Sequence, residues 1–259
     1  MARTPSEQNG PNDSAEIQAV SRAAQILALY GPDTPVLTAV EAAVRLGLNR
    51  STAYRYCTSL VTAGLLERGM EAGTFIPGGL LLQLGAYSIG RRRVMDLAPP
   101  HLRSLSNNAR MTAVLSLWGS SGPIVSRVEE EVAPIVLVTV RVGSHLPLDT
   151  AQAKVFAAFH SNDFVVSRLL ANLPHDLRAR LMADITVVRK AGYCATSSTP
   201  GIVAIAAPVF DEYGICASLA VVSTDNTLAT SSDAPQLAMV VTAARELTKE
   251  MGGFMPDNP

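Results

Sequence analysis

Two short amphipathic segments near one another restrict the fold of this chain more than any other part of its sequence. Thr38 is placed to cap the first segment, which stops at Gly47. Asn49 is placed to cap the second, residues 50–63, whose apolar side chains recur at the spacing of one helix face. Two short helices joined by a turn of a few residues that contains glycine are typical of a helix-turn-helix.

Two extended runs follow directly. Residues 65–68 and 74–77 flank a turn that glycines bracket, and this pattern predicts a β-hairpin. An amphipathic run that starts at Ala15 predicts one more helix in front of the pair. A helix-turn-helix followed immediately by a small hairpin is a winged helix.

The rest of the sequence mixes helical and extended patterns. A leucine-rich run from Gly79 predicts a connector helix that stops near Pro99-Pro100, because proline disrupts a helix interior. Runs rich in β-branched residues then alternate with helical runs, which predicts an α+β domain. The predicted organisation is a disordered lead-in (1–14), a winged helix-turn-helix domain (15–78), a connector helix (79–98), an α+β domain (99–253) and a loop tail (254–259).

The exposed face of the second helix-turn-helix segment carries groups that bind nucleic acid. Arginine makes planar, bidentate contacts with phosphates and guanine edges, and hydroxyl groups fix a helix against the DNA backbone. Lysine is absent before Lys154, so arginines alone can form a local basic face on a chain of net charge -1. The alternative is an ordinary solvated helix face, and the hairpin that follows favours DNA. The predicted DNA-contacting residues are Arg50, Ser51, Thr52, Tyr54 and Arg55 of this segment, together with Thr38 at the start of the first segment.

Other functional classes lack their motifs. The sequence has no Gly-x-Ser-x-Gly elbow, no Gly-rich phosphate loop and no His-Glu-x-x-His, and its four histidines are scattered. We therefore expect no catalytic residue, no metal site and no cofactor. With 48% hydrophobic and 17% charged residues the chain can bury a core. No apolar run reaches the ~20 residues of a membrane span, and the first ten residues are polar, so we expect a cytoplasmic protein without membrane contact.

Residues 143–154 form a Gly/Pro-rich loop that opens into a helix of small residues. Such a loop leaves room beside the backbone, and the helix N-terminus offers N–H donors to an anion. The extended runs at 201–207 and 215–222 are also rich in small residues. Together these segments either line a small-molecule pocket or pack tightly as helix on sheet, and the sequence leaves both readings open. An enzyme that uses this loop is disfavoured, because no nucleophile and base accompany it.

Taken as whole motifs, the residues resemble the IclR family of bacterial transcriptional regulators over nearly the entire chain. Residues 46–55 (LGLNRSTAYR) and 60–67 (LVTAGLLE) are similar to the winged-helix signature of that family. Residues 143–148 (GSHLPL) and 206–211 (AAPVFD) resemble its effector-domain signature. Both signatures occur in the order and at the separation found in the family.

The resemblance implies a ligand-responsive DNA-binding regulator, expected to be a repressor, that binds a palindromic operator as a dimer or a dimer of dimers. It implies a C-terminal α/β domain of the profilin or GAF kind, which binds a small organic effector such as an acid or an aromatic catabolite. The alternative is a regulator whose second domain only mediates assembly. The residues that the resemblance places near the ligand are Leu146, Ala151, Gln152, Ala153, Ala204, Ala206 and Ser218.

The chain departs from the family pattern at the expected pocket and wing. Asp149 stands where the family usually has histidine, and Ala153 replaces a usual glycine. Residues 197–199 (SST) replace an acidic pair, and residues 75–78 (FIPG) replace the Tyr-x-Leu-Gly of the wing.

Overall fold

The computed structural model describes residues 17–90, 92–130, 138–171 and 173–254. The chain divides into two compact units, residues 1–87 and 88–259. The predicted lead-in lies outside the described residues, as do the last five residues of the predicted tail. No helix of the described part is long and apolar enough to cross a lipid bilayer.

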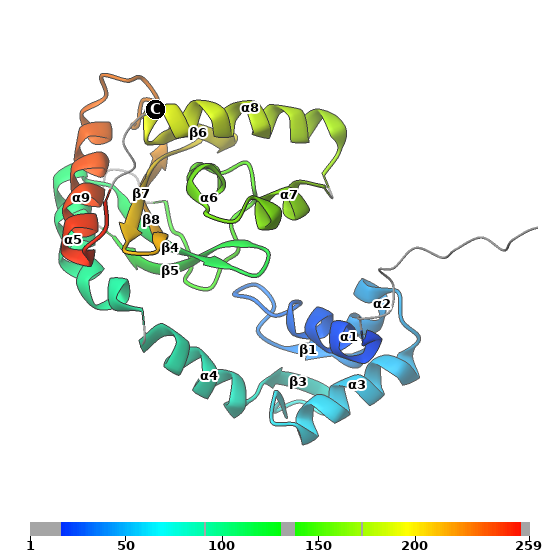
Figure 1. Ribbon diagram of the computed structural model, residues 1–259. Coiled ribbons are helices and arrows are strands. Elements are labelled where there is room, and N and C mark those ends of the chain that lie inside the picture. The colour runs from blue at the N-terminus through cyan, green and yellow to red at the C-terminus, as the bar shows by residue number, and fades with distance from the viewer. Residues whose placement is uncertain (1–16, 91, 131–137, 172, 255–259) are drawn as a thin grey trace, which may run out of the picture. The chain divides into compact units, whose positions relative to one another are not determined.

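The N-terminal unit is a winged helix (Figure 1). In chain order it contains α1 Gln18–Leu27, β1 Leu37–Thr38, α2 Ala39–Leu46, α3 Arg50–Thr62, β2 Leu66–Arg68 and β3 Thr74–Pro77. The three strands form an antiparallel sheet in the order β1-β3-β2, which confirms the predicted hairpin as β2 and β3. β1 was not predicted, because its two residues carry no strand pattern and it exists only by pairing with β3.

Local chemistry explains where the helices of this unit begin and end. Asn49 Oδ1 accepts a hydrogen bond of 2.8 Å from the backbone N–H of Thr52, which starts α3. Gly47 ends α2 in the left-handed conformation, with φ 63°. One face of α3 then enters a core made of Ile26, Leu37, Ala42, Ala53, Cys57, Leu60, Leu66 and Phe75.

Two helices follow the wing, α4 Gly79–Gly90 and α5 Arg93–Ala109. The backbone N–H of Gly79 donates to Glu67 Oε1 at 2.7 Å, which ties the start of α4 to β2. The predicted single helix over 79–98 is wrong, because α5 starts at Arg93 and continues through Pro99 and Pro100. Interior proline costs a helix about 3 kcal/mol, and burial of the apolar face of α5 offsets this. That face consists of Val94, Ala98, Leu102, Leu105 and Ala109.

The C-terminal unit contains β4 Thr112–Gly119, β5 Gly122–Glu129, α6 Ala151–Phe159, α7 Asp163–Ala171, α8 His175–Ala191, β6 Cys194–Thr199, β7 Ile202–Asp211, β8 Gly214–Thr224 and α9 Pro235–Met251. Its five strands form an antiparallel sheet in the order β5-β4-β8-β7-β6. Helices α5 and α9 pack on one face of the sheet, while α6 and α8 lie on the other (Figure 1). The predicted α+β class is confirmed.

Alternate side chains of the strands supply the two cores on either face of this sheet. Ile205 and Leu219 point toward α5 and α9, whereas Ala206 and Ala220 point toward α6 and α8. The small alanines let α6 approach the sheet closely, so part of the small-residue pattern serves packing.

A short segment runs along the outer side of β5. The backbone N–H of Val125 donates to the Ser144 carbonyl at 2.9 Å, and the Gly143 N–H donates to the Val125 carbonyl at 2.8 Å. Residues 138–142 form no regular strand, and residues 131–137 lie outside the described part.

Candidate functional site

Helix α3 brings together five of the six predicted DNA-contacting residues. Arg50, Ser51, Tyr54 and Arg55 are exposed, and Thr52 is half-buried beside them. Within the described residues, neither Arg50 nor Arg55 makes an ion pair or a side-chain hydrogen bond. Two guanidinium groups are therefore available at the first turns of a helix, where the backbone also favours phosphate oxygens.

Thr38, the sixth predicted residue, has a structural task. Its hydroxyl accepts a hydrogen bond from the Glu41 backbone N–H at 3.1 Å and donates to Glu41 Oε2 at 2.8 Å. The Thr38 backbone N–H also donates to that carboxylate, and these bonds hold the pKa of Glu41 below its usual value. Together they form a capping box at the start of α2, so the hydroxyl is already engaged in holding the helix.

The wing supplies a cationic residue that the sequence pattern did not single out. Arg68, exposed on β2, places its guanidinium carbon 5.0 Å from the ring centroid of Phe75 and 5.8 Å from that of Tyr54. A hydrogen bond from Arg68 also lowers the pKa of the Tyr54 hydroxyl. Because side chains alternate along a strand, Arg68 lies on the same face of β2 as the buried Leu66. This alternation is the one sequence signal that could have predicted the position of Arg68. Tyr54 thereby joins the exposed side of α3 to the wing.

The C-terminal unit holds a cavity of about 210 Å³ between the start of α6, strands β4, β6, β7 and β8, and the segment that precedes α6. Four predicted ligand residues line it: Leu146, Ala151, Gln152 and Ala204. The other three, Ala153, Ala206 and Ser218, are buried but do not line it. Its remaining lining residues are Val114, Val138, Val140, Pro147, Thr150, Ser198, Thr199, Ile202 and Val222. Val222 lies at the cavity because it pairs with Ala204 on the neighbouring strand. A sequence motif from one segment does not show which residues pair across strands, so Val222 could not be predicted.

Gln152 is occupied by the sheet itself. Its Nε2 donates to the Ser218 carbonyl at 2.8 Å and to the Val114 carbonyl at 3.4 Å, and its Oε1 accepts from the Ser116 hydroxyl at 3.1 Å. The side chain therefore links α6 to β4 and β8, and its amide has little capacity left for a ligand.

Lys154 is also engaged. Its ammonium lies 2.8 Å from Asp184 Oδ2 and donates to Thr196 Oγ1 at 3.4 Å, with 9% of its side chain exposed. The pair holds α6, α8 and β6 together. Cys194 lies beside it, and burial raises the pKa of this thiol to about 11, which makes it a poor nucleophile at neutral pH.

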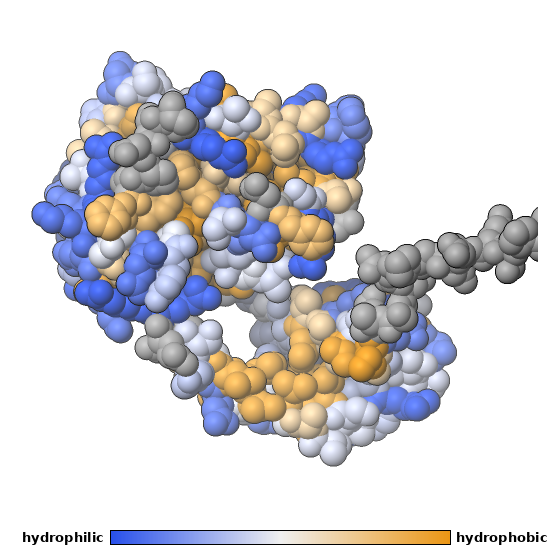
Figure 2. All heavy atoms as spheres, viewed as in Figure 1, coloured by the Kyte–Doolittle hydropathy of each residue, from blue (hydrophilic) through white to orange (hydrophobic). Residues whose placement is uncertain are grey.

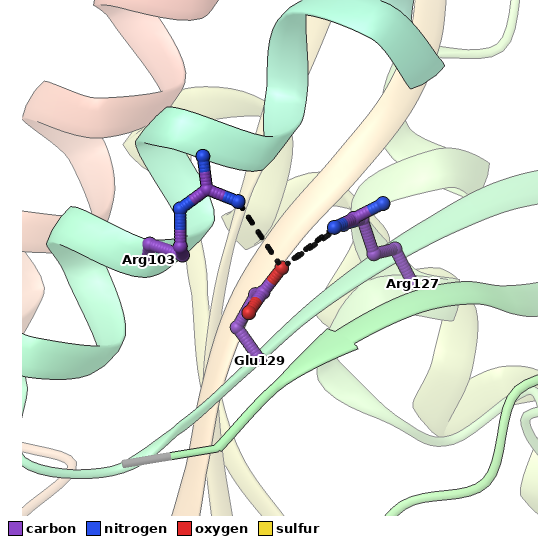
Figure 3. Close-up of polar contacts among 3 residues, drawn as sticks. All are labelled: Arg103, Arg127 and Glu129. Carbon is purple, nitrogen blue, oxygen red and sulfur yellow. Dashed lines mark hydrogen bonds and ion pairs between the residues drawn. The ribbon is translucent and has the colours of Figure 1, made fainter. Parts of the chain in front are cut away.

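A cluster of three charged side chains lies where β5 faces α5 (Figure 3). Glu129 Oε1 accepts from Arg127 Nε at 3.1 Å and Nη2 at 2.9 Å, and Arg103 Nη1 lies 4.0 Å from the same oxygen. The three side chains bond to one another, so the cluster holds the end of β5 in place. Across the described residues, no three His, Cys, Asp or Glu side chains are placed to hold a metal ion.

Comparison with known proteins agrees with this architecture. Residues 19–69 match the model of the IclR helix-turn-helix domain, and residues 86–249 match the model of the C-terminal domain of bacterial IclR transcriptional regulators. The chain is 28% identical over 235 residues to the HTH-type transcriptional regulator XynR of Escherichia coli, covering 86% of this chain and 90% of that protein. It is 24% identical over 255 residues to the transcriptional repressor IclR of the same organism, covering 93% and 92%.

Solved structures share the fold. An IclR-type regulator from a Silicibacter species superposes with a TM-score of 0.78 at 22% identity, over 93% of this chain and 98% of that chain. An IclR homologue from Microbacterium hydrocarbonoxydans, complexed with 4-hydroxybenzoate, gives 0.67 at 22% identity, over 90% and 98%.

Proposed function

Because the chain belongs to the IclR family of DNA-binding transcriptional regulators and is not an enzyme, we propose that it represses transcription in the cytoplasm from an operator bound by α3. The exposed, unpaired guanidinium groups of Arg50 and Arg55 carry this proposal. The DNA backbone would be held against α3 by Ser51, Thr52 and Tyr54. Thr38 would contribute indirectly, because it caps α2. A small organic effector in the cavity beside α6 would change operator affinity, as the 4-hydroxybenzoate complex of a fold neighbour suggests.

Two arginine variants test the DNA interface. Arg50→Ala is expected to weaken operator binding by about 1–3 kcal/mol, roughly 5- to 150-fold, because it removes a base-edge contact. Arg68→Ala is expected to weaken binding to all duplexes alike and to reduce the salt slope by about one, because the wing would touch phosphate. Fluorescence anisotropy with duplexes selected by the protein from a random pool, measured at several salt concentrations, gives both quantities.

Arg180→Ala is the matched control, since Arg180 is an exposed arginine of α8 in the other unit. Unchanged affinity of Arg50→Ala at fixed salt would remove the Arg50 side chain from the interface. A loss of sequence preference in Arg68→Ala would contradict a phosphate contact for the wing.

A second copy of the chain would cover the apolar surface of α4. Leu82 is 76% exposed and Leu84 is 53% exposed, and Figure 2 shows apolar side chains gathered over this helix. Exposed apolar patches of this kind mark interaction sites, and a symmetric dimer would match a palindromic operator. Leu82→Glu is expected to convert dimers to monomers in sedimentation equilibrium and to reduce operator affinity. An unchanged dimer would place the interface elsewhere, and Val187→Glu on the exposed side of α8 is the control.

A further inference from the structure

The lining of the cavity beside α6 is mostly apolar and carries no charged side chain. Nine of its 13 lining residues are aliphatic or proline, and the other four, Thr150, Gln152, Ser198 and Thr199, are neutral. Val114 and Ala151 are buried at its inner wall, whereas Ser198 and Thr199 are exposed at the end of β6. The cavity therefore combines an apolar interior with a hydroxyl-bearing mouth.

The polar side chains at the start of α6 are already hydrogen-bonded. The Gln152 amide bridges β4 and β8, as described above. The Thr150 hydroxyl donates to the Pro147 carbonyl at 2.7 Å. A charged ligand group that reached the interior would lose its water and find no side chain free to replace it.

No described basic side chain compensates a negative charge in the cavity. Lys154 follows the lining residues on α6, but its ammonium is paired with Asp184 at 2.8 Å. Arg141 and His145 are neighbours of lining residues in the sequence, yet neither lines the cavity. The segment 131–137 contains no lysine, arginine or histidine, so it cannot supply a cation either.

Among the described residues that line the cavity, only the backbone N–H groups in the first turn of α6 provide positive potential. A helix N-terminus carries the equivalent of roughly half a charge, which compensates only part of the unit charge of a carboxylate that has lost its water. A neutral hydroxyl or carbonyl oxygen can accept from the same N–H groups without that cost.

The volume limits the size of the ligand. An apolar protein cavity of about 150 Å³ holds benzene, so about 210 Å³ accommodates one six-membered ring with one or two small substituents. We propose that the effector is an uncharged monocyclic compound that bears a hydroxyl or carbonyl group. This inference rests on the proposed function only in placing the effector in this cavity.

A matched pair of probes tests the charge preference. 4-Hydroxybenzyl alcohol and 4-hydroxybenzoate share the ring and the phenol, and they differ in a neutral against an anionic substituent. In isothermal titration calorimetry with the full chain, the alcohol is expected to bind at least about tenfold more tightly than the acid. Equal or tighter binding of the acid would overturn the proposal, and so would binding of neither probe at millimolar concentration.

Two variants locate the binding. Ala204→Ile fills the cavity and is expected to abolish binding of the alcohol. Thr199→Lys adds a cation at the exposed mouth and is expected to shift the preference toward the acid by at least tenfold, whereas Thr186→Lys adds the same charge on the exposed side of α8 and should leave it unchanged. An unaltered preference in Thr199→Lys would show that the probe binds elsewhere and overturn the inference.

Operator binding is measured separately with and without the alcohol. If the alcohol binds with the expected preference but leaves operator affinity unchanged, the proposed regulation fails while the ligand class stands. If the acid binds and alters operator affinity, the proposed regulation stands while the ligand class is wrong.

Discussion

Replacement of Phe75 by alanine is expected to unfold the N-terminal unit while the C-terminal unit stays folded. The Phe75 ring is fully buried at the centre of the small core, and Arg68 lies over its face. The backbone carbonyl of Phe75 accepts from the Tyr30 hydroxyl at 3.1 Å. Truncation of a buried phenylalanine costs about 3–5 kcal/mol, and a unit this small has little more stability than that. Operator binding should be lost at the same time, because α3 and the wing both pack on this ring.

Differential scanning calorimetry checks this expectation. The wild type should show transitions for both units, and the variant should lose only the one assigned to the winged helix. Phe164→Ala, at a phenylalanine of α7 that is 72% exposed, is the control and should change neither transition by much. A Phe75→Ala protein that keeps both transitions and binds DNA would contradict the described core.

Replacement of Gln152 by alanine is expected to destabilise the C-terminal unit by about 2–5 kcal/mol, whether or not a ligand is present. The variant leaves the Ser116 hydroxyl and the Ser218 and Val114 carbonyls without their partner in a site where only 4% of the residue is exposed. Each buried polar group left unsatisfied costs about 1–3 kcal/mol. Gln152, which the family resemblance places near the ligand, would then mainly stabilise the sheet on which α6 packs.

Urea unfolding followed by the fluorescence of Trp118 measures this effect in the right unit. Trp118 is the one tryptophan of the chain, and its ring packs 5.4 Å from that of Phe156 on α6. Gln236→Ala, at a glutamine of α9 outside the lining, is the matched control. If Gln152→Ala unfolds at the wild-type urea concentration yet no longer binds ligand, the residue serves the ligand directly.

Structural elements that depend on residues adjacent in the sequence could be predicted. Elements that depend on contacts between residues far apart in the sequence could not. The caps at Thr38 and Asn49 and the hairpin turn depend on a few adjacent residues, so the helix-turn-helix and the wing are where the pattern put them. α5 continues through its two prolines because the sheet buries its apolar face. The sequence around the prolines does not show that this sheet will cover the helix. β6 was missed for the same reason, since its polar residues become a strand only by pairing with β7.

The candidate sites follow the same division. The exposed residues of α3 follow from helix periodicity, whereas the position of Arg68 over Tyr54 and Phe75 depends on how the wing meets α3. In the cavity, helix α6 was predicted with its small residues, but the sequence could not show that its glutamine and lysine are already bonded. Those two contacts reduce the polar groups left for a ligand, and they join segments 30 or more residues apart.

The segment that lies along β5 also protects the sheet from other molecules. An outermost strand with free N–H and C=O groups is a template on which strands of other chains can add and aggregate. In this unit, residues 143–146 occupy those groups at Pro123 and Val125, and Arg127 and Glu129 place charges farther along the same strand. The wall of the cavity is therefore also the part of the chain that keeps this side of the sheet from polymerising.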